Sequence, residues 1–188
     1  MVFNTIWVFI MKLTKGDKIG DINLPSIDGK KFNIKNIAGK KTIITFYRFA
    51  TCPFCNLRIN EIINRYNELN PKFNMIGIFD STLEFLTESM KKHDLPFTIL
   101  ADENFEYFKK YEIERSIAKT FSAMLFKPHK IIPAMMKGYI PTKIKGHLDI
   151  AVTDVLINEQ GVVEEVYYAQ KDIADHFEFE KIKQFALN

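Results

Sequence analysis

A chain of 188 residues is long enough for one domain with a sizeable core, or for one domain that carries an insertion. Apolar residues make up 47% of the sequence, which excludes an intrinsically disordered chain. The formal net charge of +3 is too small to indicate a nucleic-acid partner, and two cysteines are too few for a disulfide-stapled secreted scaffold.

The first ten residues differ in character from the chain that follows. Val2 to Met11 is an apolar run that is too short to span a bilayer, which takes about 20 residues. It also lacks the basic start and the small-residue cleavage site of a signal peptide. We therefore predict a disordered extension or a mis-called start over residues 1–10, followed by a single domain over residues 11–188 of a cytoplasmic protein.

The rest of the chain alternates between predicted strands and helices. In chain order the elements are a hairpin turning at Asp28-Gly29, a strand at 43–47, a helix that begins at the cysteines, a strand at 75–79, a helix behind the capping box at 81–84, a strand at 97–100, a helix at 102–111, an insertion, a hairpin of two strands at 150–157 and 162–168, and a last helix that Asp175 caps. Strand–helix–strand units closed by an antiparallel hairpin predict an α/β protein with a mixed central sheet covered by helices on both faces.

The only two cysteines lie in Cys52-Pro53-Phe54-Cys55, between a predicted strand and a predicted helix. The β-branched, apolar run before them is typical of a central strand, and Pro53 suits the first turn of a helix. At a helix N-terminus the free backbone N–H groups and the helix dipole favour an anion, so a thiolate here is expected to have a lowered pKa. With the C-x-x-C spacing, this position predicts a redox-active pair of thiols.

Six short segments follow one another along the chain in an order that is typical of one protein family. They are Gly16-Asp17-Lys18-Ile19-Gly20, Leu24-Pro25 with Asp28-Gly29-Lys30, Ile44 to Arg48 leading into the cysteines, Ile99-Leu100-Ala101-Asp102, Val155-Leu156-Ile157-Asn158 before Gly161, and Ala174-Asp175-His176. Together they resemble the thioredoxin superfamily and, within it, the peroxiredoxin-like proteins of the AhpC/TSA family (alkyl hydroperoxide reductase and thiol-specific antioxidant). The resemblance runs from about residue 14 to the C-terminus, outside the insertion, and implies a thioredoxin-like fold and a thiol peroxidase.

The resemblance also assigns roles near the cysteines. Peroxiredoxins carry P-x-x-x-T-x-x-C, and the final Cys, which attacks peroxide, falls on Cys55. Its sulfenic acid would condense with Cys52, at the Thr position, to a disulfide that a thioredoxin-like donor reduces. Arg48, at the Pro position, or Arg58 would stabilise the thiolate. The family implies no cofactor and is compatible with a homodimer.

Two departures from the family pattern bear on activity. The later active-site Arg of peroxiredoxins has no match, because the four arginines are Arg48, Arg58, Arg65 and Arg115. The proline that thioredoxins place before the equivalent strand would fall near Val152, where none is present. The machinery for polarising a peroxide is therefore incomplete by the family's own pattern.

Other functions are compatible with the same cysteines. In a thiol–disulfide oxidoreductase, Cys52 would be the exposed nucleophile and Cys55 the buried resolving thiol. In a non-catalytic redox sensor, both thiols would be packed as small apolar groups. A metal site is not expected, because zinc needs about four ligands and the chain supplies two Cys and scattered His.

Three more polar side chains draw attention. Arg48 either pairs with a carboxylate at the edge of the sheet or lies beside Cys55. His176, next to Asp175, either lies at the start of the last helix without a chemical role or takes part in catalysis. His93 follows two lysines and is expected to be exposed to solvent.

The insertion, Arg115 to Leu148, is unusual in charge. It holds seven Lys or Arg and no Asp or Glu, with apolar side chains between them. We predict two short helices that cover the end of the sheet. A basic, Met-rich surface would also suit an anionic lipid near the cysteines, such as a fatty-acid hydroperoxide or a membrane surface, or an acidic partner.

Overall fold

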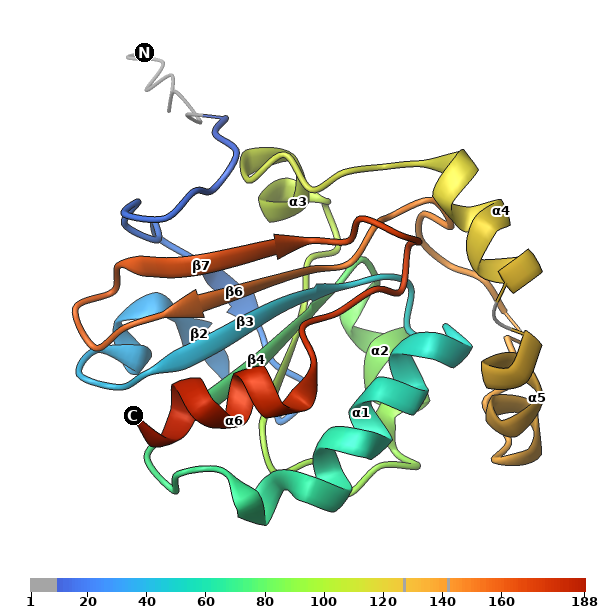
Figure 1. Ribbon diagram of the computed structural model, residues 1–188, viewed down its shortest axis with the longest axis horizontal. Helices are drawn as coiled ribbons and strands as arrows, with labels where there is room; N and C mark the ends of the chain where they lie inside the picture. The colour runs from blue at the N-terminus through green and yellow to red at the C-terminus, as the bar shows by residue number, and fades with distance from the viewer. Residues whose placement is uncertain (1–9, 127, 142) are drawn as a thin grey trace.

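The computed structural model describes residues 10–126, 128–141 and 143–188 (Figure 1). Apart from Ile10, the extension predicted at the N-terminus lies outside the described residues.

The centre of the molecule is a sheet of five strands in the order β5-β4-β3-β6-β7. The strands are β3 (Thr42–Tyr47), β4 (Asn74–Phe79), β5 (Thr98–Ala101), β6 (Thr153–Ile157) and β7 (Val163–Tyr168). β3, β4 and β5 run parallel, whereas β6 runs antiparallel to β3 and β7 antiparallel to β6. The mixed sheet predicted from the sequence is therefore confirmed, with β3 in the middle and every residue of β3 buried.

The remaining elements surround this sheet. The helices are α1 (Pro53–Arg65), α2 (Leu83–Met90), α3 (Glu106–Lys110), α4 (Ile117–Phe126), α5 (Pro128–Met136) and α6 (Phe179–Leu187), and short 3-10 turns occupy Ile34–Ile37 and Tyr66–Glu68. The hairpin predicted at Asp28-Gly29 forms a separate two-stranded sheet of β1 (Asn23–Pro25) and β2 (Lys31–Asn33). Figure 1 shows α1 and α6 side by side on one face of the central sheet and α3 on the other.

Alternation along β3 divides the core between the two faces, because successive side chains of a strand point to opposite sides. Phe46 packs with Phe108 of α3, and their ring centroids are 5.3 Å apart in an edge-on arrangement. On the other face Tyr47 stacks on Phe79 at 4.9 Å, in the cluster of buried residues that contains both cysteines and Ile59 of α1. The candidate site thus lies between the end of β3 and α1.

Several helix starts differ from the sequence prediction. The helix predicted over 102–111 is shorter than expected and consists of α3 alone. It begins late because the Asp102 carboxylate accepts the N–H groups of Glu106, Tyr107 and Phe108. α2 begins one residue later than its predicted capping box, with Thr82 as the N-cap. Asp175 does not cap α6.

The N-cap of α6 is Glu178, which makes no side-chain capping bond. Asp175 lies three residues earlier, and its carboxylate accepts the hydroxyl of Tyr167 at 2.7 Å. The prediction of Asp175 as the cap was wrong because its carboxylate binds the hydroxyl of Tyr167, eight residues earlier on β7, and α6 begins only at Phe179.

The insertion does contain a pair of short helices, α4 and α5, as predicted. In Figure 1 they stand at one end of the sheet, and α5 lies beside α1. Among the described residues no helix is both long and apolar enough to cross a membrane.

Candidate active site

The cysteines lie where the sequence places them, between a central strand and a helix. β3 ends at Tyr47, a short loop follows, and Cys52 is the N-cap of α1 with Pro53 in the first turn. Both cysteines are free thiols, and neither has any exposed surface. This burial contradicts the exposed Cys52 that the oxidoreductase alternative expects.

Arg48 is the positive group beside the dithiol. Its side chain is buried, and its Nη1 atom donates to the Cys52 sulfur at 3.4 Å. Burial opposes ionisation of Cys52, but the thiol hydrogen bond from Cys55, the charge of Arg48 and the N–H groups at the helix start together lower its pKa to about 6. The sequence left two positions open for Arg48, at a carboxylate on the edge of the sheet or beside the cysteines. The structure has it beside the cysteines, in contact with Cys52.

Cys55 has the opposite character. Burial, its hydrogen bond to Cys52 and the negative charge of the Cys52 thiolate raise the pKa of Cys55 well above its ordinary value. At neutral pH the favoured state is therefore a Cys52 thiolate that accepts a hydrogen bond from a Cys55 thiol. The resemblance assigns the attack on peroxide to Cys55, and that assignment stays a prediction.

Asn56 is a site residue that the sequence reasoning missed. It is fully buried on the first turn of α1, and its amide nitrogen donates to the backbone carbonyls of Ala50 and Cys52 at 3.0 and 2.8 Å. Its amide oxygen lies 2.9 Å from Nε2 of His93. The only signal in the sequence was a polar residue in an apolar helix position directly after Cys55.

His93 is consequently not the exposed side chain that was predicted. It is half-buried between Asn56 and the ring of Tyr139, whose centroid is 5.4 Å away. Burial and the neighbouring Lys92 lower the pKa of His93 to about 4, so its imidazole is neutral at pH 7.

Residues 143–149, here called the strap, lie across the loops that hold the cysteines. The backbone carbonyl of Lys143 accepts the Thr51 hydroxyl at 2.8 Å, and that of Leu148 accepts Nη2 of Arg48. His147 donates its backbone N–H to the Asp80 carboxylate at 2.5 Å and places its Nδ1 2.8 Å from the same oxygen. Three contacts thus join the end of the insertion to the loops after β3 and β4.

Two further residues discussed from the sequence, Arg58 and His176, line a hollow beside α1 and have partners other than the sulfurs. Arg58, the alternative to Arg48, makes an ion pair with Glu61 at 2.7 Å and donates to the Phe177 carbonyl, and no bond to a sulfur is observed. His176 does not decorate a helix start, because its Nδ1 lies 3.2 Å from the carboxylate of Asp154 on β6.

The position near Val152, where thioredoxins carry a proline, faces the same cluster. Val152 is fully buried in the apolar group that contains Cys52 and Cys55, and its backbone N–H donates to the Ile173 carbonyl. A proline could not make that hydrogen bond, because it lacks an N–H group. This chain therefore joins β6 to the segment before α6 by a backbone contact at this position.

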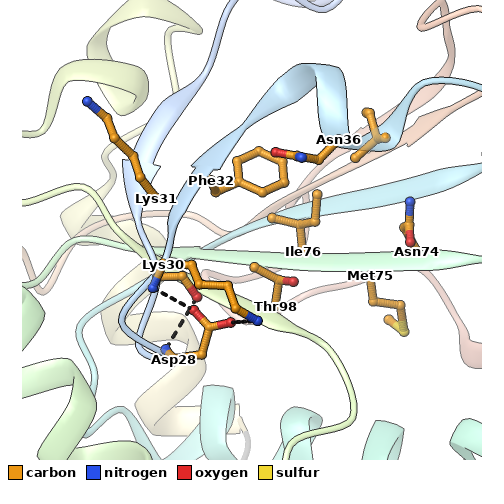
Figure 2. A pocket seen from close by; sticks show the side chains of 11 residues that line it. Asp28, Lys30, Lys31, Phe32, Asn36, Asn74, Met75, Ile76 and Thr98 are labelled. Atoms are coloured by element: carbon orange, nitrogen blue, oxygen red, sulfur yellow. Dashed lines mark hydrogen bonds and ion pairs between the residues drawn. The ribbon is translucent and has the colours of Figure 1, made fainter.

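The cavity of Figure 2 lies away from the cysteines. It has a volume of about 260 Å³ and lies between the β1–β2 hairpin and the first residues of β4 and β5, such as Asn74 and Thr98. Figure 2 shows Asp28 and Lys30 joined at its mouth. Because β4 runs parallel to β3, this is the opposite end of the sheet from Cys52. Within the described part of the chain no group of three or more His, Cys, Asp or Glu is arranged to hold a metal ion.

A mixed sheet with a C-x-x-C pair at the start of its first long helix defines a thioredoxin-superfamily protein with a dithiol site. The chain belongs to the AhpC/TSA family, whose sequence model matches residues 15–137.

Relatives and solved structures agree with this assignment. Peroxiredoxin Bcp of Escherichia coli (strain K12) is 27% identical over 116 residues, which cover 60% of this chain and 74% of that protein. A putative peroxiredoxin bcp of Helicobacter pylori (strain ATCC 700392 / 26695) is 26% identical over 161 residues, covering 85% and 91%. A peroxiredoxin-like protein from Aquifex aeolicus superposes with a TM-score of 0.68 at 11% identity over 95% of this chain and 89% of that one, which shows the shared fold.

Proposed function

We propose that this protein is a thiol peroxidase that reduces hydrogen peroxide or organic hydroperoxides with its two cysteines. The observation that carries the proposal is the pair of contacts at Cys52, an Arg48 guanidinium 3.4 Å from its sulfur and a hydrogen bond with the Cys55 thiol. A thiolate is the attacking form of cysteine, and a second thiol beside it can resolve the oxidised product. Membership in the AhpC/TSA family supports the same activity.

The reaction begins at the more acidic sulfur. The Cys52 thiolate attacks the nearer peroxide oxygen, the S–O bond forms, and the O–O bond breaks. The departing oxygen leaves with the bonding electrons, and Arg48 stabilises its negative charge until it takes a proton. Cys52 is then a sulfenic acid, and Cys55 displaces its hydroxyl group as water to form the Cys52–Cys55 disulfide.

The disulfide returns to the dithiol by exchange with a reduced dithiol of a thioredoxin-like donor, which becomes oxidised. This cycle requires a reducing compartment, so we propose a cytoplasmic location. A homodimer is part of the same proposal on family grounds, and sedimentation of the reduced protein tests it.

The order of attack proposed here reverses the roles that the family pattern implies for Cys52 and Cys55. The local charges support the reversal, because Arg48 bonds to the Cys52 sulfur and the buried Cys55 thiol is the donor. The competing order has Cys55 as the peroxide-attacking thiolate and Cys52 as the resolving thiol.

One experiment tests both the activity and the order. Reduced Cys52→Ser and Cys55→Ser variants are treated with hydrogen peroxide and dimedone, and adducts are counted by intact mass. We expect a sulfenic acid adduct on Cys52 in Cys55→Ser and little or none in Cys52→Ser. An adduct on Cys55 in Cys52→Ser supports the family order, and slow, equal chemistry at both sulfurs contradicts a peroxidase and favours a packed, non-catalytic pair.

A thiol–disulfide oxidoreductase is the second candidate. The division into an acidic Cys52 and a less acidic Cys55 is the one that such an enzyme uses. It is distinguished by its substrate, because fast mixed-disulfide formation at Cys52 without a peroxide response supports it and excludes the peroxidase.

For the substrate we propose an anionic, lipid-like hydroperoxide that approaches over the insertion. The sequence from Arg115 to Leu148 has no acidic residue, and its large apolar side chains are unusually exposed. The exposed ones are Ile117, Phe121, Ile132, Met135, Met136, Ile140, Ile144 and Leu148. Apolar side chains among lysines suit the boundary of an anionic lipid, where both the hydrophobic effect and the charge contribute.

Charge variants test the substrate class. Replacing Lys137, Lys143 and Lys145 by Gln should slow turnover of a fatty-acid hydroperoxide severalfold and leave turnover of hydrogen peroxide unchanged. The matched control replaces exposed lysines at the other end of the sheet, Lys31 and Lys35, and should affect neither substrate. An equal effect on both peroxides, or on none, would end this idea.

A further inference from the structure

The first helix of the insertion, α4, is amphipathic in the reverse of the usual sense. A helix on the surface of a globular protein turns its apolar stripe toward the core and its charged side chains toward water. In α4, Ile117 and Phe121 lie four residues apart on one face and are 65% and 61% exposed. Lys119, on the opposite side, is mostly buried. Its Nζ atom donates to the Ala169 carbonyl at 2.7 Å and pairs with Glu114 at 2.8 Å. α4 therefore presents apolar side chains to solvent and holds a lysine against the protein.

The second helix, α5, shows the same inversion. Ile132, Met135 and Met136 have the spacing of one helix face, and all three are exposed, Met136 to 84%. Ala134, on the opposite side of the helix, is fully buried, and α5 lies beside α1 (Figure 1). Exposed apolar surface of this kind marks a site of interaction with a protein or a membrane.

The same apolar surface extends to the cover of the dithiol. Ile140, Ile144 and Leu148 follow α5 in the chain and are about half exposed. The backbone carbonyl of Leu148 accepts Nη2 of Arg48, whose Nη1 donates to the Cys52 sulfur. In Figure 1 α4 and α5 stand together at one end of the sheet. We call this set the apolar face of the insertion, and it consists of Ile117, Phe121, Ile132, Met135, Met136, Ile140, Ile144 and Leu148.

The charge of the insertion limits what can cover this face. Residues 115–148 hold seven of the 26 Lys and Arg and none of the 23 Asp and Glu, so their formal charge is +7 and that of the remaining chain is −4. A second copy that docked through the same face would bring a second +7 against the first, and like charges repel. The face therefore suits an anionic occupant.

The lysines lie among the apolar side chains and do not form a rim around them. Met136 is followed by Lys137, and Ile144 stands between Lys143 and Lys145, with all three lysines exposed. The core of a protein–protein interface is depleted of lysine, and its charged groups gather at the rim. A bilayer surface instead supplies anionic headgroups next to acyl chains everywhere, and a lysine stem can lie along the apolar layer with its ammonium group at the headgroups. This interleaving favours a lipid surface over an acidic protein.

We propose that the apolar face of the insertion docks the protein on an anionic bilayer, with α4 and α5 lying at the boundary between headgroups and acyl chains. The docking uses only this surface, so it does not depend on any reaction of the dithiol. Docked in this way, Leu148 brings the strap, and with it the contact of Arg48 with Cys52, close to the lipid. Only that consequence, delivery of membrane lipid hydroperoxides to Cys52, rests on the function proposed above.

Flotation with vesicles tests the docking. The full chain is mixed with vesicles of phosphatidylcholine, alone or with about 30% phosphatidylglycerol, and floated through a density gradient at low and at high salt. We expect most of the protein to float with the anionic vesicles at low salt, severalfold less at high salt because salt screens the charges, and little with the neutral vesicles. The assay contains no peroxide, so a failure of the proposed peroxidase does not change its result.

The informative variant is Phe121→Gln combined with Met136→Gln, which removes one exposed apolar side chain from each helix and leaves the charge unchanged. We expect its bound fraction on anionic vesicles to fall about fivefold or more. The matched control is Leu187→Gln at the end of α6, where an apolar side chain is 55% exposed outside the insertion, and it should bind like the parent. The apolar run at residues 2–11 is common to all these proteins, so it cannot cause a difference between them.

Contact with the acyl chains is tested separately from attraction by charge. With anionic vesicles the fluorescence of Phe121→Trp should shift to the blue relative to the parent, and that of Leu187→Trp should not. Equal flotation of parent and double variant, or no shift in Phe121→Trp, would overturn the docking. A parent that sediments as a dimer without floating, and a double variant that sediments as a monomer, would place a second copy on this face and also overturn it.

Discussion

The two sides of the dithiol are built from different parts of the chain and favour opposite protonation states. Cys52 faces the first N–H groups of α1 and Arg48, which also donates to the Leu148 carbonyl of the strap, and the pKa of Cys52 is lowered. Cys55 lies on the inner side toward Tyr47, and its pKa is raised. Both sulfurs are equally buried, so burial alone does not set their chemistry. The charges and donors that each sulfur meets decide between thiolate and thiol.

A large effect is expected from removing Asn56, the hydrogen-bonded frame that both sides of the dithiol share. Asn56→Ala leaves the Ala50 carbonyl without its buried donor and leaves the Cys52 carbonyl with only the backbone N–H of residue 56, which should lower the free energy of unfolding by about 2 kcal/mol. Urea unfolding of the reduced protein measures it. Asn60→Ala, one turn further along α1 and only half-buried, is the control and should change little. Equal losses in the two variants would mean that Asn56 has no special role in the frame.

The Cys52 side depends on Arg48. Arg48→Met should raise the pKa of Cys52 and slow its reaction with peroxide at pH 7 by about tenfold, since the loss of thiolate is partly offset by a more nucleophilic sulfur. The thiolate absorbance at 240 nm, followed against pH, reports the pKa. Arg48→Lys keeps the positive charge but not the forked guanidinium contact. Its Cys52 pKa and its rate with peroxide should lie between those of the parent and of Arg48→Met. If the titration of Cys52 is not shifted in Arg48→Met, the N–H groups at the start of α1 are enough to lower its pKa without Arg48.

The lowered pKa of Cys52 also predicts how stability depends on pH. A group whose pKa is depressed by folding stabilises the folded state above its ordinary pKa, and this contribution is lost as the pH falls toward the folded value of about 6. Between pH 6 and pH 9 the reduced protein should therefore gain on the order of 1 kcal/mol per pH unit relative to Cys52→Ser. If the free energies of unfolding of the parent and of Cys52→Ser, measured in urea, change in parallel with pH, the pKa of Cys52 is not lowered by folding.

The smallest effect concerns the strap. Gly146 has φ +112°, and a Cβ there would lie 2.5 Å from the Asp80 carbonyl oxygen, whereas Gly138, at φ +78°, has nothing within 4 Å. Both Ala variants carry the backbone strain of a positive φ, but only Gly146→Ala should displace the strap. We expect about threefold faster alkylation of Cys52 by iodoacetamide in Gly146→Ala and no change in Gly138→Ala. Equal rates would mean that the strap does not limit access to Cys52.

The order of strands and helices follows from local patterns in the sequence. The buried run before the cysteines, the apolar spacing after them and the Asp28-Gly29 turn predict β3, α1 and the hairpin, because periodicity and turn chemistry act over a few residues. The late start of α3 and the uncapped start of α6 escaped prediction. At α3 the Asp102 carboxylate binds N–H groups four to six residues later in the chain, and at α6 the Asp175 carboxylate binds the Tyr167 hydroxyl of β7 and caps no helix.

The sequence by itself determined that a thiol pair stands at the head of a helix behind a central strand, and that the chain has the segments of the AhpC/TSA family. Only the tertiary structure decided which sulfur meets Arg48, that Asn56 holds the Cys52 carbonyl, and that Asp154 pairs with His176. The reason is physical: a helix start is encoded within a few neighbouring residues, whereas a protonation state depends on charges that the fold brings from distant parts of the chain.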